Sequence, residues 1–303
     1  MVIDVLVNGD QMPFRSMKFE LQSFANELNP LQCGLRLNRA YQTLLDMNQW
    51  SFLKRSALIN TVPPYIAGTV TVTTGSATVT GIGTAFTAVM AGRYFRLSTQ
   101  FEFYLIQSVS VALQTLTLES AVGTGATGST YTIFKTHYPK PANTKHIINL
   151  SRELLLAERT QEWLDSFDPD RMSTGPPIVW SNYDDATLEI YPPSDQVYVI
   201  RVYYKISVAD LAAETDVPLL PENLIILHAA KAAYRQLGSK PEGQGYLKLL
   251  PGLQEEFKDA WTAAWETDMS KQSLPEQVVT DQGGAMPTSV EFTIDKDTFW
   301  SGR

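Results

Sequence analysis

The chain has 303 residues, of which 44% are hydrophobic and 18% charged, with a formal net charge of −8 and a pI near 5.0. This composition is typical of a soluble globular protein with one or two domains and argues against intrinsic disorder. The excess of acidic residues also argues against a protein that binds nucleic acid through its phosphate backbone.

Few residues are available for disulfide, metal or membrane chemistry. The single cysteine, Cys33, can form no internal disulfide, which favours folding in a reducing cytoplasm. His137, His146 and His228 are scattered and have no zinc-site spacing, so we expect no metal and no cofactor. Residues 1–7 carry Asp4 and no basic flank, so no signal peptide is indicated. No apolar run approaches the roughly 18 residues of a membrane span.

The N-terminal part predicts two packed helices. Apolar residues recur at helical spacing from Met17 to Leu28, which indicates a first amphipathic helix. Asn29-Pro30 then starts a second helix, because Asn is a good N-cap and Pro suits the first helical position. That helix runs into Asn48-Gln49-Trp50-Ser51-Phe52.

Residues 67–135 differ from the rest of the chain. They contain fifteen threonines, eight glycines, no proline and five charged residues. Valines alternate with threonines around a turn at Thr74-Gly75-Ser76, and further short strands are expected at 94–97, 103–109, 115–118 and 131–134. Five or six such strands suit a small barrel or sandwich. We therefore expect an all-β module inserted into the chain.

After the insert, residues 145–150 predict a strand that leads into a helix ending at Asp168-Pro169. Residues 178–180, 187–191 and 197–206 predict an antiparallel meander. A helix follows over 222–237, ended by Gly238, and a last helix spans 244–269 with a break or kink at Pro251-Gly252.

The last residues predict an extended arm with an apolar end. Val290, Phe292 and Ile294 alternate ahead of Phe299 and Trp300. We interpret this stretch as a docking element for a partner. The alternative is a terminus that packs on its own domain.

These elements predict an α+β fold. It consists of a helical-bundle host with an antiparallel β meander, an inserted all-β barrel or sandwich, and an extended C-terminal arm. The expected domains are a discontinuous host at 1–66 and 136–269, the insert at 67–135 and the arm at 270–303.

Two motifs have structural and functional interpretations. Gly123, Gly125 and Gly128 satisfy GxGxxG, but a strand is expected after them where a dinucleotide site needs a helix, so a glycine-rich loop is the better interpretation. The acids Asp165, Asp168, Asp170, Asp184 and Asp185 could serve glycoside hydrolysis. Helix ends and turns explain them better, and we expect no catalytic residue.

Two basic pairs and the tryptophans predict no binding site. Lys54 with Arg55, and Arg93 with Arg96, could touch a passing phosphate backbone, but a solvated surface is the simpler interpretation. Trp261 and Trp265 share one helix face, where packing is the expected role.

A series of short fragments resembles one known family. In chain order they are Trp50-Ser51-Phe52-Leu53-Lys54-Arg55, Tyr138-Pro139, Ile147-Ile148-Asn149-Leu150, Gly175-Pro176-Pro177, Leu188 to Pro193, Val202-Tyr203-Tyr204-Lys205, Asp210-Leu211 and Asp216 to Pro221. Together they resemble the head-to-tail adaptor proteins of tailed bacteriophages, the family that includes tail tubular protein A. The insert also looks like a β-module common in phage structural proteins.

This resemblance implies a structural virion protein made in the bacterial cytoplasm, with no enzymatic activity. It would form a ring, typically dodecameric, beneath the portal vertex, with the tail tube, nozzle or fibre proteins on its other side. Its helices would form the ring wall, and the arm with Val290 to Trp300 would reach the portal. Genomic DNA would pass through without sequence-specific binding, which suits an acidic conduit.

Other functions remain open. A stopper, another neck protein or a protein that attaches tail fibres differs from an adaptor only in its place in the particle. A carbohydrate-binding fibre protein would explain the insert, but fibres are mostly β and trimeric. A hydrolytic virion protein would need convergent carboxylates in a cleft.

Overall fold

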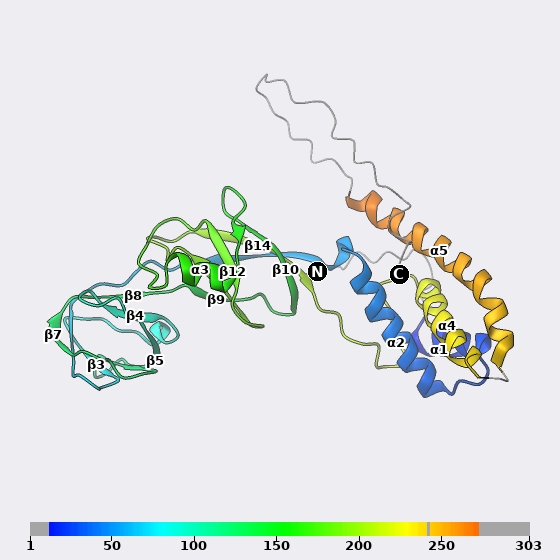
Figure 1. The fold of residues 1–303 in the computed structure, drawn as a ribbon, viewed down its shortest axis with the longest axis horizontal. Helices are drawn as coiled ribbons and strands as arrows, with labels where there is room; N and C mark the ends of the chain where they lie inside the picture. Colours follow the sequence, from blue (N-terminus) through cyan, green and yellow to red (C-terminus); the bar gives the residue numbers. More distant parts are fainter. Residues whose placement is uncertain (1–11, 241–242, 273–303) are drawn as a thin grey trace, which may run out of the picture.

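The computed structural model describes residues 12–240 and 243–272. Within these ranges the chain forms fourteen strands in three sheets and only five α-helices. The predicted helical-bundle host is therefore wrong: outside the insert, a three-stranded and a four-stranded sheet form a hydrophobic core separate from that of the helices. Figure 1 shows an elongated arrangement, with the insert at one end, the two other sheets in the middle and four long helices at the other end.

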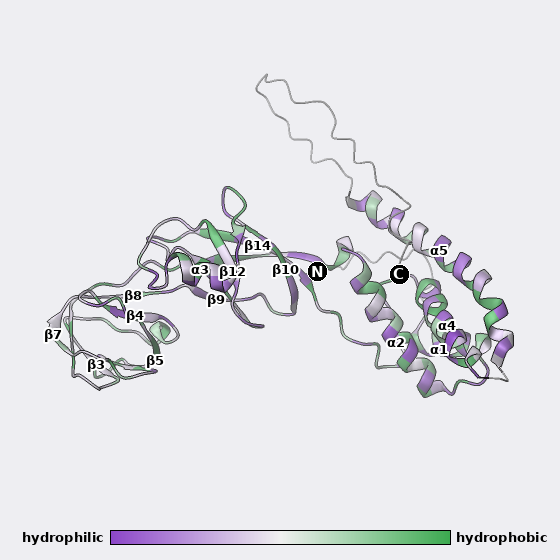
Figure 2. Ribbon diagram, viewed as in Figure 1, coloured by the Kyte–Doolittle hydropathy of each residue, from purple (hydrophilic) through white to green (hydrophobic). Residues whose placement is uncertain are grey.

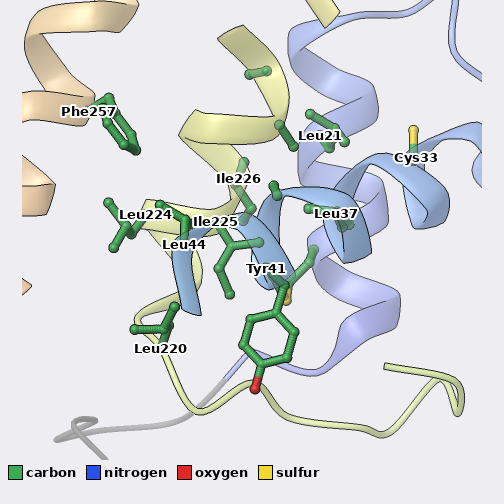
Figure 3. Close-up of a cluster of buried hydrophobic side chains, with 14 of the residues drawn as sticks. Leu21, Cys33, Leu37, Tyr41, Leu44, Leu220, Leu224, Ile225, Ile226 and Phe257 are labelled. Atoms are coloured by element: carbon green, nitrogen blue, oxygen red, sulfur yellow. The ribbon is translucent and has the colours of Figure 1, made fainter. Parts of the chain in front are cut away.

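The four long helices pack around one hydrophobic core, the helical core. They are α1 (Phe14–Phe24), α2 (Pro30–Met47), α4 (Glu222–Gly238) and α5 (Gln244–Gln272). Figure 2 shows hydrophobic and hydrophilic bands along them, as expected for helices with one buried side. Side chains from the N-terminal and the C-terminal parts of the described chain meet here, including Leu37 of α2, Ile225 of α4 and Phe257 of α5 (Figure 3).

The predicted start of α2 is confirmed. The Asn29 side chain accepts a hydrogen bond from the Gln32 amide at 2.8 Å, and the Gln32 side chain accepts one from the Asn29 amide at 3.2 Å. This capping box satisfies backbone donors that the first turn leaves without partners. Of the predicted break or kink at Pro251-Gly252, the break is wrong, because α5 continues through Pro251 to Gln272.

The middle of the molecule is a β-sandwich. One layer has three antiparallel strands in the order β1-β14-β10, which are β1 (Lys54–Asn60), β14 (Val199–Ile206) and β10 (Thr144–Ser151). The other has four strands in the order β11-β12-β13-β9, which are β11 (Ala157–Glu158), β12 (Val179–Asn182), β13 (Thr187–Tyr191) and β9 (His137–Pro139). Both layers contribute to a second hydrophobic core that includes Trp180 and Val202.

Helix α3 (Gln161–Phe167) is shorter than predicted. Leu156, which precedes it, lies in the sandwich core, and the next two residues pair with β12 as strand β11. Thr160 is the true N-cap, accepting a hydrogen bond from the Trp163 amide, and Asp168 ends the helix as predicted. Leu164 packs on Val179 and Tyr191, so α3 covers the side of the four-stranded sheet that faces away from the sandwich core.

The insert is a curled, seven-stranded antiparallel sheet with its own hydrophobic core. Its strands are β2 (Thr69–Val72), β3 (Thr78–Ile82), β4 (Tyr94–Leu97), β5 (Tyr104–Ser110), β6 (Thr115–Leu118), β7 (Ala126–Ser129) and β8 (Tyr131–Phe134). The sheet order begins with β7 and ends with β8, and only Thr130 separates these strands in sequence. The two edges therefore come together, and the inward Val, Leu and aromatic side chains are enclosed.

Candidate functional site: the junction of the insert and the sandwich

A buried ion pair lies beside β13. Arg171 Nε donates to Glu189 Oε1 at 2.7 Å, and the two side chains are only 5% and 1% exposed. Glu189 is in the middle of β13, whereas Arg171 belongs to the loop after α3 and has a positive φ of 48°. A non-glycine residue in this backbone region is uncommon and is held there by its surroundings.

The remaining Arg171 donors are also engaged. Nη2 donates to Asp165 Oδ1 at 2.6 Å, and Nη1 donates to the carbonyl of Asp168 at 2.6 Å. Burial disfavours the charge, but the bonds and attraction of Glu189 and then Asp165 outweigh it, so the pKa of Arg171 lies above its ordinary value. Gln161 donates to the second oxygen of Glu189 at 2.6 Å, which completes the network.

The insert reaches this loop through Arg96 of β4. Arg96 is buried, and its Nη1 donates to the carbonyl of Asp170 at 2.7 Å. Its guanidinium also lies 5.1 Å from the centre of the Phe134 ring of β8. Burial lowers the pKa of Arg96, and Asp168 and Asp170 partly oppose this effect. A charge from the insert is thus held by backbone oxygens of the sandwich loop.

An aromatic layer lies at the same junction. Tyr94 of β4 is 5.3 Å from His137 of β9, and His137 is 4.1 Å from Tyr183, between ring centres. Burial lowers the pKa of His137 and raises that of Tyr94, so both rings are neutral at neutral pH. Lys135 extends the layer, because its ammonium lies 4.9 Å from the centre of the Tyr138 ring.

The junction fixes the orientation of the insert on the sandwich. A hydrogen bond from Arg96 and a ring contact from Tyr94 join β4 of the insert to the loop that follows α3 and to β9, and Lys135 adds a cation–π contact with Tyr138 of β9. Arg171 and Glu189 bind each other and other groups of the chain. Their role is to hold the loop that follows α3 against β13. The arrangement holds the insert against the sandwich through Arg96 and the loop that follows α3.

The acidic residues are mainly structural. Asp168 accepts hydrogen bonds from the amides of Met172 and Ser173 and from the Tyr191 hydroxyl, and Asp184 accepts from the amides of Ala186 and Thr187. The predicted turn role is confirmed for these two. Asp165 lies in the last turn of α3, near the helix end, and pairs with Arg171.

The GxGxxG glycines permit a close backbone approach. Strand β8 follows Gly128, as the strand interpretation predicted, and Gly128 itself lies in β7. A Cβ at Gly125 would lie 2.5 Å from the Thr74 amide nitrogen and 2.7 Å from the Val72 carbonyl oxygen. Gly128 has φ +60°, which favours glycine. The loop therefore packs against β2.

Two open grooves lie on the sandwich and beside the end of α2. The larger, about 510 Å³, is lined by Lys140, His146, Asp184 and neighbouring residues, and the smaller, about 400 Å³, is lined by Asp46, Lys145 and Lys205 among others. The Asp184 side chain accepts hydrogen bonds within its own β-turn, and Asp46 pairs with Lys145 and Lys205. Asp184 and Asp46 thus have structural partners.

The predicted docking residues Val290, Phe292, Ile294, Phe299 and Trp300 lie outside the described residues. The predicted packing role is confirmed for Trp261, whose ring centre lies 5.5 Å from that of Trp50. Sequence reasoning assigned Arg96 to a solvated surface, which is wrong, and did not single out Arg171 or Glu189. A charged residue in the middle of the apolar β13 pattern, Leu188-Glu189-Ile190, was the available signal for the ion pair.

No family model matches this chain. A search of curated proteins also found no match. Among the described residues, no group of three or more His, Cys, Asp or Glu side chains could hold a metal ion. Within the same ranges, no helix has both the length and the apolar character to cross a membrane.

Proposed function

We propose that this chain is a structural virion protein, the subunit of a head-to-tail adaptor ring. The ring, dodecameric by the family resemblance, joins the portal vertex to the tail and forms part of the conduit for genomic DNA. The proposed role is architectural and involves no catalysis.

The observation that carries this proposal is the ordered set of fragments that resemble phage adaptor proteins. Every one lies in the helical core, the sandwich or their connections, and none lies in the insert. Several of their residues are buried core positions: Trp50 and Leu220 in the helical core, and Ile147 and Val202 in the sandwich core. The resemblance therefore involves residues that determine packing.

The arrangement of the molecule supports the same proposal. Three separate hydrophobic cores follow one another along the long axis, and the insert and the four long helices lie at opposite ends (Figure 1). An elongated subunit with a β-sheet module at one end and packed helices at the other suits a protein that joins two different neighbours. The junction at Arg96 and Arg171 would hold the insert in a fixed direction toward tail or fibre proteins.

Imaging of the purified protein with and without its portal tests this proposal. We expect rings by negative-stain electron microscopy, either spontaneously or when the portal is added. Monomers that persist and ignore the portal would contradict the adaptor role.

A truncation after Gln272 tests the proposed portal contact of the C-terminal residues. It is placed there because α5 continues to this residue. We expect reduced portal binding, whereas Phe292→Ser and Trp300→Ser in the full chain should reproduce part of the loss. Undiminished binding of the truncated chain would exclude the proposed arm contact.

A further inference from the structure

Two cations, the cation pair Arg93 and Lys135, lie where the insert passes into the sandwich. Arg93 comes just before β4 and Lys135 just after β8, and the register of these strands places the two residues opposite each other. The same register pairs Phe95 with Ile133, and both of these belong to the insert core. Because side chains alternate along a strand, the cation pair lies on this inward side, at the edge of the insert core.

The sandwich closes this corner with Tyr138 of β9. The Tyr138 ring is buried in the sandwich core, and the Lys135 ammonium lies 4.9 Å from its centre. The Tyr138 hydroxyl accepts a hydrogen bond from the Val62 amide at 3.1 Å. Burial raises the pKa of this hydroxyl to about 12, so it is neutral at neutral pH and supplies no negative charge to the corner.

Within residues 12–240 and 243–272, no carboxylate neutralises the cation pair. Neither side chain forms an ion pair or a hydrogen bond there, and the enclosed Nε of Arg93 has no acceptor. Burial lowers the pKa of Arg93, and burial followed by the Arg93 charge lowers the pKa of Lys135. Like charges directly opposite each other on neighbouring strands destabilise a sheet, so this arrangement is costly without an anion.

A small ligand can reach the corner, because both residues of the cation pair are partly exposed. A water molecule would accept a hydrogen bond from the guanidinium but would leave the repulsion between the two cations unchanged. An oxyanion does both. The guanidinium presents a planar fork of donors and the ammonium presents three rotatable donors, and the two together fit the oxygens of a phosphate group.

We infer that the corner formed by Arg93, Lys135 and Tyr138 binds a terminal phosphate group, either free phosphate or the monoester of a small metabolite. Such a group carries a charge of about −1.5 to −2 at pH 7, which matches two cations, whereas each phosphate of the DNA backbone carries a single charge. The bound group would tie β4 to the connection between β8 and β9, and so strengthen the attachment of the insert. The inference goes beyond the proposed virion role and does not depend on ring assembly.

Isothermal titration calorimetry of the full chain tests the site. The buffer has low salt and no phosphate, and the probes are inorganic phosphate and glycerol 3-phosphate. We expect one site per chain, and Kd at least about tenfold weaker in Arg93→Gln and in Lys135→Gln, because each removes a charge-assisted hydrogen bond. Lys258→Gln on α5 is the matched control for loss of an exposed cation and should bind normally. Arg93→Lys, which keeps the charge but loses the fork, should retain part of the affinity.

The probes distinguish the two sources of the phosphate group. Similar affinities for both probes would support recognition of the group on a small molecule, and binding of inorganic phosphate alone would support the free ion. Duplex DNA without terminal phosphates is the contrast. Tighter binding of this DNA than of phosphate, lost in the same two variants, would overturn the terminal phosphate. A wild-type chain that binds neither probe, or binding unchanged in both glutamine variants, would overturn the site.

Thermal melts with and without phosphate provide a second measurement, and circular dichroism checks that each variant is folded. A ligand that binds the folded state raises the melting temperature, so we expect phosphate to stabilise the wild-type chain. The glutamine variants should gain much less. Because each variant is compared with itself in the two buffers, a loss of packing cannot produce this difference. An equal gain in the variants and the wild type would contradict the site, and no outcome here affects the ring.

Discussion

Arg171 and Glu189 form an ion pair across 2.7 Å, beside the strand through which the sandwich meets the insert. Arg171 bonds on one side to the acids of its own layer, and its backbone loop accepts Arg96 from the insert on the other. Loss of this pair therefore affects both the stability of the sandwich and the attachment of the insert.

We expect Glu189→Gln to destabilise the protein by about 3–5 kcal/mol, because it leaves the Arg171 charge buried without its main partner. Urea unfolding followed by tryptophan fluorescence measures the change. Asp165→Asn is the matched control, since Asp165 bonds to the same guanidinium but is largely exposed, and an exposed pair contributes about 0–1 kcal/mol. Equal losses of unfolding free energy in the two variants would show that burial does not determine what each carboxylate contributes.

Removal of Trp50 should damage the helical core. This side chain is fully buried, packs edge-on against Trp261 and donates from its indole nitrogen to the Leu44 carbonyl at 2.9 Å. We expect Trp50→Ala to cost about 3–5 kcal/mol by cavity formation. Trp163→Ala on exposed α3 should change the melting temperature much less. A small effect at Trp50 would show that the helices pack differently.

The Gly-rich loop offers a test between two glycines of one motif. Gly125→Ala places a Cβ against the backbone of β2, so we expect the insert to unfold at lower temperature. Gly123→Ala is the control, because its Cβ would meet only the Glu102 side chain, at 4.0 Å. Differential scanning calorimetry compares the two. Equal melting temperatures would contradict the backbone contact at Gly125.

Acid should weaken the helical core through His228 of α4. Burial, aided by Lys231 and Arg235, lowers the pKa of His228 to about 4, from an ordinary value of 6.5. Between these values the unfolded chain binds a proton that the folded chain does not, so stability falls as pH falls from about 6.5 to about 4. Above pH 6.5 the residue has no effect.

Thermal melts across this pH range measure the effect. The His228→Gln variant should lose part of the pH dependence, because it cannot titrate. His137→Gln serves as the comparison, since burial also lowers the pKa of His137 but at the junction instead of the helical core. An unchanged slope in His228→Gln would contradict the assignment.

Local signals predicted much of the fold. Alternating valines and threonines gave the strands of the insert, and Asn29-Pro30 gave the start of α2, because both patterns depend only on nearby residues. The host was predicted less well. Lys54–Asn60 alternates weakly and follows a helix, so nothing local marked it as a strand; it forms because β14, far along the chain, pairs with it.

The candidate site was harder to predict than the strands. Arg96 was interpreted as a surface charge and Arg171 was not singled out, because burial of a charged group depends on partners that the tertiary fold brings together. Arg96 and Asp170 are 74 residues apart in sequence, so only the docked insert makes them neighbours. Glu189 between two apolar residues was the one local sign of a buried polar network.

The division of the helical core between the two ends of the described chain governs the order of folding during synthesis. Asn38 of α2 bonds to the Leu211 carbonyl, 173 residues later, and α2 packs against α4. The insert, in contrast, has all its core residues in one continuous stretch. On the ribosome the insert can fold as it emerges. The apolar faces of α1 and α2, in contrast, stay exposed until α4 has been synthesised. This interval is when the nascent chain most needs protection from aggregation.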